Sequence, residues 1–211
     1  MDLSELPAQA FTRHPWEKAR VKFFSRVIQE SLVQRCAELS ILDVGGGDGY
    51  FATTIRSRLH QPGEGVCWDI NYTDEFLASQ EGAAFTFTKN RPTKKFDVLL
   101  LMDVLEHVEH DRMFLTNLVQ ENLREDGVVL LSVPAWQFLF SSHDARLKHH
   151  RRYSPKACRQ VMRDSGLVVV SSGGLFHTLI LPRMLQKIKE RLVKEDEERQ
   201  LPDLGNWSHG K

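Results

Sequence analysis

The 211-residue chain has little cysteine, no excess of charge of either sign and no long apolar run. Its three cysteines, Cys36, Cys67 and Cys158, are too few and too irregularly spaced for a disulfide framework or a metal knuckle. Lysine plus arginine (28) balances aspartate plus glutamate (28), which argues against a general nucleic-acid binder because such proteins usually carry a basic excess. No apolar run approaches the roughly 18 residues of a membrane span. These shortages predict a cytoplasmic protein.

Length and composition fit one domain with an appendage. Hydrophobic residues make up 41% of the chain, which is enough for a sizeable core. We expect a main domain over residues 1–178 and a charged helical tail over residues 179–211, where apolar residues repeat at helical spacing. A partner, a second copy of the chain or a peripheral membrane contact could cover that apolar stripe. The opening residues lack a basic stretch followed by an apolar one, so we expect no signal peptide.

Strand patterns alternate with helix patterns along the main domain. This alternation predicts an α/β fold, a doubly wound and mostly parallel sheet with helices on both faces. The helical patterns cover residues 16–39, 49–60, 73–80, 111–123 and 154–166. The strand patterns cover residues 40–44, 65–70, 83–88, 96–102, 128–134 and 167–172, and the motif "REDG" before the fifth of them predicts a turn.

The sequence "ILDVGGGDGYFA", residues 41–52, is the densest chemical signal. A strand pattern ends in Asp43, four glycines follow within five positions, and a helix pattern begins. Glycines at such a turn let the backbone approach a ligand closely. The dinucleotide fingerprint G-x-G-x-x-G would need a glycine where Tyr50 stands, and Asp43 would repel a pyrophosphate. The loop therefore favours a ligand that carries an ammonium group.

The second predicted strand ends near Asp69. A carboxylate at this place can accept hydrogen bonds from both ribose hydroxyls of a bound nucleoside. Together with Asp43, it predicts a nucleoside with an amino-acid end and no phosphates. S-adenosylmethionine fits that description.

Four motifs, in order, resemble the class I S-adenosylmethionine-dependent methyltransferases of the small-molecule type. They are "ILDVGGGDGYFA", "VCWDI", "FDVLLLMDVLEHVEHD" and "LREDGVVLLSVP", and the resemblance extends roughly over residues 16–172. It implies a Rossmann-like methyltransferase fold, which usually ends in a seventh, antiparallel strand. This chain is expected either to lack that strand or to hide it in "GGLFHTLI". In this family an N-terminal helix often forms a lid over the cofactor, and the alternative here is a plain amphipathic helix packed on the sheet.

The resemblance also implies which residues hold the cofactor. These are Asp43, Gly45, Gly46, Gly47, Gly49, Asp69, Ile70, Asn90, Asp103, Val104 and His107. Among them, Asp69 would hold the ribose and Ile70 would lie beside the adenine. Asp103 and Val104 would flank the reacting sulfonium. Many relatives use an acid before the fourth strand to bind the adenine amino group, and here Asn90 would accept that hydrogen bond instead.

The stretch "PAWQFLFSSHDARLKHHRRY", residues 134–153, is long and irregular. It follows the carboxyl end of a central strand, the edge where parallel sheets bind ligands. It is similar to a bacterial methyltransferase subgroup with the pattern HD…H-x-RRY, whose members are often associated with cell-surface glycan or lipid-linked sugar pathways. The stretch is therefore expected to bind the methyl acceptor.

Methyl transfer from a sulfonium needs alignment, and it needs a base only when the nucleophile arrives protonated. His143 with Asp144 is the first acid/base candidate and His150 is a further one, with structural hydrogen bonding as the alternative. Arg151 and Arg152 are predicted either to grip an anionic acceptor or to pair with a core acid. No ligand spacing demands a metal ion from His143, Asp144 and His150, so we predict no metal site.

The sequence thus predicts an enzyme that methylates a small or lipid-linked acceptor, with oxygen as the favoured atom and cell-surface glycan metabolism as the favoured context. Balanced charge and the lack of an "NPPY"-type motif argue against a nucleic-acid acceptor. The competing hypothesis is a non-catalytic binding or scaffold subunit that keeps a methyltransferase fold. A nicotinamide oxidoreductase is disfavoured by Tyr50.

Overall fold

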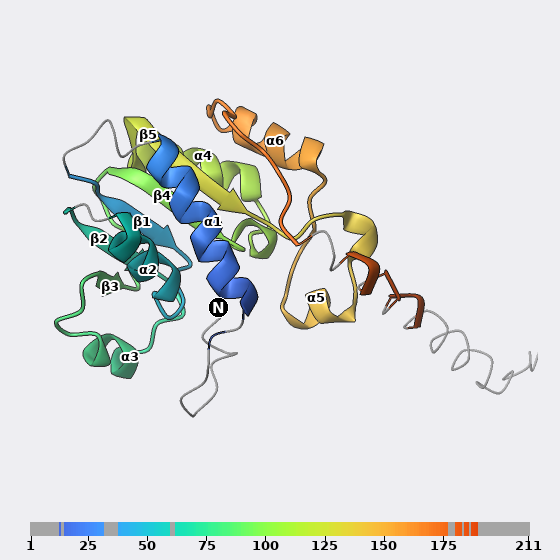
Figure 1. Ribbon diagram of the computed structural model, residues 1–211, viewed down its shortest axis with the longest axis horizontal. Coiled ribbons are helices and arrows are strands. Elements are labelled where there is room, and N and C mark those ends of the chain that lie inside the picture. Colours follow the sequence, from blue (N-terminus) through green and yellow to red (C-terminus); the bar gives the residue numbers. More distant parts are fainter. Residues whose placement is uncertain are drawn as a thin grey trace, which may run out of the picture.

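The computed structural model describes residues 13, 15–31, 38–59, 62–176, 180–182, 184–185 and 187–189. Its centre is a five-stranded sheet in which every neighbouring pair is parallel (Figure 1). The strand order is β3-β2-β1-β4-β5. The strands are β1 (Ile41–Val44), β2 (Gly65–Trp68), β3 (Thr86–Thr88), β4 (Phe96–Met102) and β5 (Leu123–Ser132). The predicted α/β fold with a parallel sheet is confirmed.

Helices cover both faces of the sheet, and each face has its own apolar core. On one face lie α1 (Pro15–Ser31) and α2 (Tyr50–Leu59), which bury Ile28 and Ile55 against it. In Figure 1, α1 crosses in front of the sheet. On the other face α4 (Asp111–Asn122) buries Leu115, and α6 (Pro155–Asp164) buries Val161. The central strands β1 and β4 are almost wholly buried because helices cover them on both sides.

Capping residues set the beginnings of two helices. The N-cap of α3 (Asp74–Ser79) is Thr73, whose hydroxyl accepts a hydrogen bond from the backbone N–H of Phe76 at 3.1 Å. The N-cap of α6 is Ser154, followed by proline at the first helical position. Gly166, with φ of 84°, follows the end of α6.

The sixth predicted strand is wrong. Residues 167–172 form no strand in the structure, although their β-branched pattern is typical of one. Val168 and Val170 are 86% and 92% exposed, so the alternating side chains find no sheet to pack on. Residues 173–176 of the predicted hidden strand are not in a strand either, and the next three residues lie outside the described ones. Within the described residues, no strand follows β5.

The predicted turn before β5 is also wrong, because β5 already begins at Leu123. Leu123 pairs with Phe96 and Val128 pairs with Val98, so the two strands shift register between these pairs. The residues 124–127 form an irregularity inside β5 that absorbs the shift. The polar residues and the glycine of this irregular part of the strand are also typical of a turn, which is why the sequence predicts one.

The long stretch 134–153 is more regular than its sequence suggests. It contains η3 (Gln137–Leu139) and α5 (Ser142–Arg146). Its two ends are tied together, because the N–H of Trp136 donates to the Tyr153 carbonyl and the N–H of Tyr153 donates to the Pro134 carbonyl, both at 2.9 Å. The stretch is therefore a closed loop that follows the end of β5. The prediction that it follows a central strand is wrong, because β5 is an edge strand of the described sheet.

The helical tail is described only in part, as short helical segments within residues 180–189. The rest of the predicted tail lies outside the described residues. No helix in the described part of the chain is long and apolar enough to cross a membrane.

Candidate functional site

Three strands bring their carboxyl ends together at one edge of the sheet. In β1, Asp43 lies opposite Cys67 of β2 on one side and opposite Leu100 of β4 on the other. The glycine loop, Asp69 and Asp103 follow the ends of β1, β2 and β4 respectively. The fold thus gathers residues that are far apart in the sequence into one place, where open parallel sheets bind ligands.

The glycine loop is bare because its backbone and its neighbours exclude side chains. Gly45, Gly47 and Gly49 have φ of 64°, 52° and 70°, in the left-handed region that favours glycine. A Cβ on Gly45 would lie 2.9 Å from a methyl of Val104, and one on Gly49 would lie 2.5 Å from the ring of Phe87. The loop therefore presents backbone, and not side chains, at the ligand edge.

One glycine substitution in this loop and one elsewhere in the chain separate the cost of a packing clash from the cost of backbone strain. We expect Gly49→Ala to lower the free energy of unfolding by about 2–4 kcal/mol, because a left-handed alanine is strained and its methyl also collides with Phe87. The control is Gly82→Ala, since Gly82 has φ of 81° but no atom within 4 Å of the position that a Cβ would take. That control should lose about 1–2 kcal/mol from strain alone. Urea denaturation followed by circular dichroism measures both, and equal losses would contradict the packing argument.

Asp69 is joined to the glycine loop by a hydrogen bond. One carboxylate oxygen of Asp69 accepts from the backbone N–H of Gly47 at 3.1 Å, and the other accepts from the N–H of Asn71 at 2.9 Å. Ile70 beside it is 75% exposed, which leaves its side chain available to a flat ring. Asn90 is exposed after β3, and its backbone exchanges hydrogen bonds with the Thr88 hydroxyl. The ribose and adenine assignments of these residues stay predictions.

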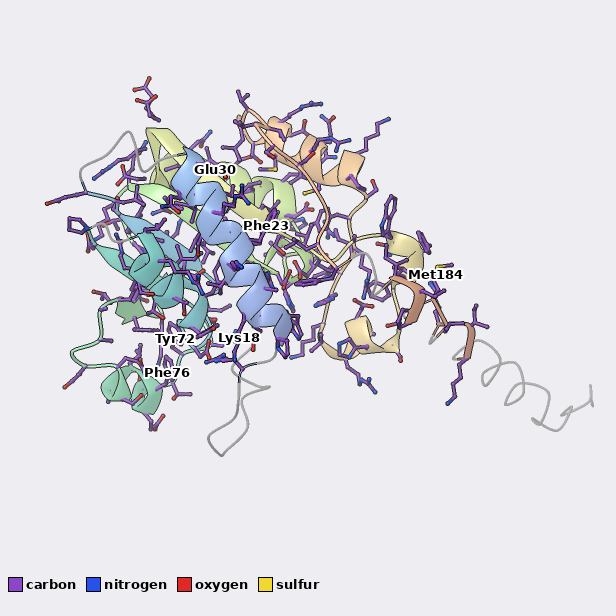
Figure 2. The ribbon with its side chains drawn as sticks, viewed as in Figure 1. Lys18, Phe23, Glu30, Tyr72, Phe76 and Met184 are labelled. Atoms are coloured by element: carbon purple, nitrogen blue, oxygen red, sulfur yellow. The ribbon has the colours of Figure 1, made fainter. Side chains whose placement is uncertain are left out.

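Tyr72 is a feature of this edge that the sequence motifs do not reveal. Its ring stacks on Phe76 with centroids 4.8 Å apart, and Figure 2 shows the two side chains together beside α3. Its hydroxyl is buried and has no hydrogen-bond partner in the described part of the chain, and it lies 3.1 Å from the position that a Cβ on Gly46 would take. A buried hydroxyl without a partner beside a bare loop suits a polar ligand atom. The only sequence signal is an aromatic residue shortly after Asp69.

Asp43 is a buried acid behind the loop. It is 2% exposed, and burial raises the pKa of its carboxyl to about 7. The negative charges of Asp69 and Asp48 act in the same direction, whereas the Arg20 guanidinium lowers the pKa. A carboxylate that is this short of positive charge is suited to an ammonium group.

Helix α1 reaches across to the end of β4. The guanidinium of Arg20 donates to a carboxylate oxygen of Asp103 at 2.6 Å and to the hydroxyl of Ser132 at 3.0 Å. That hydroxyl in turn donates to the other Asp103 oxygen at 3.1 Å. Asp103 has φ of 60°, so its backbone turns sharply where β4 ends. Val104 follows and packs against Gly45, which places this one of the two predicted sulfonium neighbours beside the glycine loop.

Arg13 closes the same edge near the start of α2. Its guanidinium pairs with Asp48 of the glycine loop and lies 4.2 Å above the ring of Tyr50. It also lies 3.5 Å from a carboxylate oxygen of Glu17. Arg13 therefore lies against the glycine loop, and the role of the N-terminal segment as a lid stays a prediction.

Several charged residues of the loop 134–153 form ion pairs with other residues of this chain. Asp144 is fully buried, and it accepts hydrogen bonds from Arg152 Nε at 2.8 Å and from the backbone N–H of Ser141 at 2.9 Å. Although burial alone would raise the pKa of Asp144, these hydrogen bonds lower it to about 2. Arg151 pairs with Asp111 at 3.0 Å. Both arginines thus have acids of this chain as partners, and acceptor binding by either of them stays a prediction.

The histidines of this loop separate in the structure. Asp144 contacts His149 Nδ1 at 3.0 Å, and His143 lies beside Asp144 on α5 without a hydrogen bond between their side chains in the described structure. His150 is exposed, and its backbone N–H donates to the Glu106 carbonyl at 2.7 Å. The acid/base roles of His143 and His150 stay predictions, and His149 is a neighbour of the site that the sequence motifs leave out.

Glu106 and His107 lie at the base of the same loop, in η2 (Leu105–His107). Glu106 is fully buried, and neither of its carboxylate oxygens has a hydrogen-bond partner among the residues that the structure describes. Burial raises the pKa of Glu106 to about 9, and the nearby charge of Asp103 acts in the same direction. The rings of His107 and His149 meet edge to face with centroids 4.6 Å apart.

The edge as a whole fits S-adenosylmethionine. A bare glycine backbone can approach the amino-acid end of the ligand, and buried Asp43 can receive its ammonium group. Asp69 lies one hydrogen bond away from that loop, within reach of a ribose.

Comparison with known proteins points to the same cofactor. Residues 12–172 match the model of a family described as "Methyltransferase domain". The chain is 28% identical over 102 residues to the ubiquinone biosynthesis O-methyltransferase of Rickettsia canadensis, which covers 46% of this chain and 43% of that protein. It is 30% identical over 138 residues to an uncharacterized methyltransferase of Mycobacterium tuberculosis, which covers 59% of this chain and 50% of that protein. The chain thus spans half or less of the length of these curated relatives.

Solved structures share the fold at low sequence identity. A Galdieria sulphuraria protein with the provisional name sarcosine dimethylglycine methyltransferase aligns with a TM-score of 0.61 at 15% identity, over 88% of this chain and 74% of that one. The YcgJ protein of Bacillus subtilis aligns with a TM-score of 0.56 at 18% identity, over 83% and 82% of the two chains. These likenesses show the fold alone. With the family match over most of its length, the chain belongs to the class I S-adenosylmethionine-dependent methyltransferases.

Proposed function

We propose that this protein transfers the methyl group of S-adenosylmethionine to a hydroxyl oxygen of a small or lipid-linked acceptor. The observation that carries the proposal is the arrangement of two acids around the glycine loop. The backbone N–H of Gly47 donates to the Asp69 carboxylate, and Asp43 is buried behind the same loop. The name of the Rickettsia relative, an O-methyltransferase, supports oxygen as the acceptor atom.

The acceptor would lie against the loop 134–153. Trp136 and Phe138 are 37% and 55% exposed on this loop, and their ring centroids are 6.0 Å apart. Exposed aromatic rings favour an apolar portion in the acceptor. Arg151 and Arg152 already pair with Asp111 and Asp144, so the loop offers less support for a strongly anionic acceptor than its sequence does. Membership of the bacterial HD…H-x-RRY subgroup and a role in cell-surface glycan metabolism rest on the sequence of this loop.

The chemistry asks the protein mainly to bind, orient and exclude water. When bound, S-adenosylmethionine supplies a methyl group on a positively charged sulfur. The contact from Arg20 on α1 to Asp103 and Ser132 holds a helix over the end of β4, where the sulfonium is proposed to lie. Holding acceptor and methyl in line in such a covered place is the main source of acceleration for a donor that is already activated.

The first test is binding of S-adenosylhomocysteine by calorimetry. We expect one saturable site in the full chain, and at least a 100-fold weaker affinity in Asp69→Ala, because two charge-assisted hydrogen bonds to the ribose would be lost. The control variant is Asp74→Ala, an exposed acid of α3 that pairs with Lys89, and it should change the affinity less than twofold. NAD serves as the control ligand and should not bind.

The outcome also decides between the two hypotheses for the chain. If the wild-type chain binds no S-adenosylhomocysteine, the non-catalytic scaffold hypothesis replaces this proposal. If Asp69→Ala binds as tightly as wild type, the site assignment is wrong even though the cofactor is right.

A further inference from the structure

Glu106 is an unusual residue because its carboxyl is fully buried. Within the described residues, neither of its oxygens has a hydrogen bond. A buried carboxyl of this kind is expensive unless a hydrogen-bond donor or a cation is supplied. The mechanism proposed above makes no use of it. The arrangement around Glu106 therefore calls for a separate explanation.

Two histidines face this carboxyl from different parts of the chain. One carboxylate oxygen of Glu106 and one ring nitrogen each of His107 and His149 all lie within 4.8 Å of one another. His107 follows Glu106 in η2, whereas His149 comes from the turn after α5. The N–H of His150 donates to the Glu106 carbonyl at 2.7 Å, which fixes the second segment against the first. The cluster is thus held by the backbone as well as by side chains.

Asp144 orients His149 from behind. Its carboxylate contacts His149 Nδ1 at 3.0 Å, which leaves Nε2 as the ring nitrogen that is available to a ligand. Arg152 and Ser141 hold the same carboxylate with hydrogen bonds of 2.8 and 2.9 Å. A carboxylate that fixes the far nitrogen of a histidine is the usual outer partner of a metal-binding histidine.

We propose that Glu106, His107 and His149 bind a divalent transition-metal ion, with Asp144 as the outer partner of His149. Two imidazoles and one carboxylate are the donor set of Zn²⁺ and of Mn²⁺, Fe²⁺ or Co²⁺, whereas Mg²⁺ and Ca²⁺ prefer oxygen ligands alone. Ligand atoms around a tetrahedral Zn²⁺ lie about 3.4 Å apart, so a small closure of the three side chains is enough.

Three protein ligands leave at least one coordination position open. Glu106 lies in η2, which follows the carboxyl end of β4, so the open position belongs to the same edge of the sheet as the proposed methyl donor. Its role, which rests on the proposed function, is to bind the acceptor hydroxyl. The metal-bound hydroxyl releases its proton to water, and its oxygen then forms the bond to the methyl carbon as the carbon–sulfur bond breaks. The products are the methyl ether and neutral S-adenosylhomocysteine.

The test is metal binding to the full chain after removal of metal with a chelator. Titration with Co²⁺ should give one ion per chain and the intense visible absorption of a four- or five-coordinate site, and Zn²⁺ should displace it. We expect Glu106→Gln and His149→Ala to weaken Co²⁺ binding at least 100-fold, and Asp144→Asn to weaken it about 10–100-fold. The matched control is His110→Ala, an exposed histidine just before α4, which should leave binding unchanged. Circular dichroism verifies that each variant is folded.

Azide tests the open position, because it should shift the visible spectrum of the Co²⁺ form by binding there. Weak absorption of fully hydrated Co²⁺, or equal binding in folded Glu106→Gln and wild type, would overturn the metal site. Calorimetry with S-adenosylhomocysteine on the same samples keeps the two proposals apart. Cofactor binding without metal binding refutes the metal site alone, and metal binding without cofactor binding refutes the proposed function while the metal site stands.

Discussion

Replacing Asp144 with alanine is expected to lower the free energy of unfolding by about 3–5 kcal/mol. The carboxylate is fully buried, and it is the acidic partner of Arg152, whose own side chain is only 9% exposed. Removing one member of a buried ion pair leaves the other charge without compensation, which is the costly case. His149 and the N–H of Ser141 would lose their acceptor as well. The measurement is urea denaturation of both proteins, followed by circular dichroism.

Two further variants test whether the burial of the charged pair causes the loss of stability in Asp144→Ala. Asp144→Asn keeps an oxygen that can accept from Arg152 but removes the charge, so it should lose less than the alanine variant. Asp164→Ala removes an acid whose 3.1 Å bridge to Arg112 is partly exposed, and it should cost about 1 kcal/mol or less. A loss below about 1 kcal/mol in Asp144→Ala would show that water replaces the carboxylate.

The cofactor edge is predictable from the sequence because its signals are local. The glycine loop, Asp43 and Asp69 lie at the ends of strands whose apolar patterns are continuous. Parallel strands place their carboxyl ends at one edge, so finding the strands is enough to bring these residues together. The left-handed φ values at Gly45 and Gly49 agree with the reason for expecting glycine there.

The cluster around Glu106 is not predictable in this way, because it joins residues about forty positions apart through a loop. Sequence adjacency suggests that Asp144 assists His143. Adjacent residues on a helix point about 100° apart, however, and α5 directs Asp144 inward to His149 and Arg152. Only the fold of the loop, tied at Pro134 and Tyr153, decides which histidine the acid meets.

The wrong sixth strand has a related cause. The segment 167–172 has the β-branched residues typical of a strand, but a strand also needs a neighbour to pair with. Val168 and Val170 are exposed because no such pairing forms in the described structure. Local propensity states which conformation a segment tolerates, whereas pairing depends on the rest of the chain.

Replacing Asp43 with asparagine is expected to stabilise the ligand-free protein and to weaken its cofactor binding. The pKa of Asp43 is about 7 in the folded protein, above the ordinary value of 3.8. Between pH 4 and pH 7 the folded state therefore binds more protons than the unfolded state, and stability falls as the pH rises through this window. A shift of this size corresponds to up to about 4 kcal/mol at pH 8. We expect Asp43→Asn to recover about 2–4 kcal/mol there.

The pH dependence separates this charge effect from a change in packing. At pH 3 and below, Asp43 is mostly protonated in both states, so the variant should gain little over wild type. At pH 8 the gain should be at its full size. Urea denaturation of both proteins at the two pH values measures the difference, and a gain that is the same at both would show that charge is not the cause.

Whereas Asp43→Asn should raise the stability of the ligand-free protein, it should lower the affinity for the cofactor. Under the proposed function, the ammonium group of S-adenosylhomocysteine supplies the positive charge that Asp43 lacks, so asparagine should weaken binding about 10–100-fold through loss of a charge-assisted hydrogen bond. The ammonium would also favour the ionised carboxyl, and wild-type affinity should therefore rise between pH 5.5 and 8 while that of Asp43→Asn stays flat. A protein that is more stable but binds less well would identify the buried acid as a residue kept for its ligand at the expense of the fold. Tighter or unchanged binding in the variant would remove Asp43 from the site.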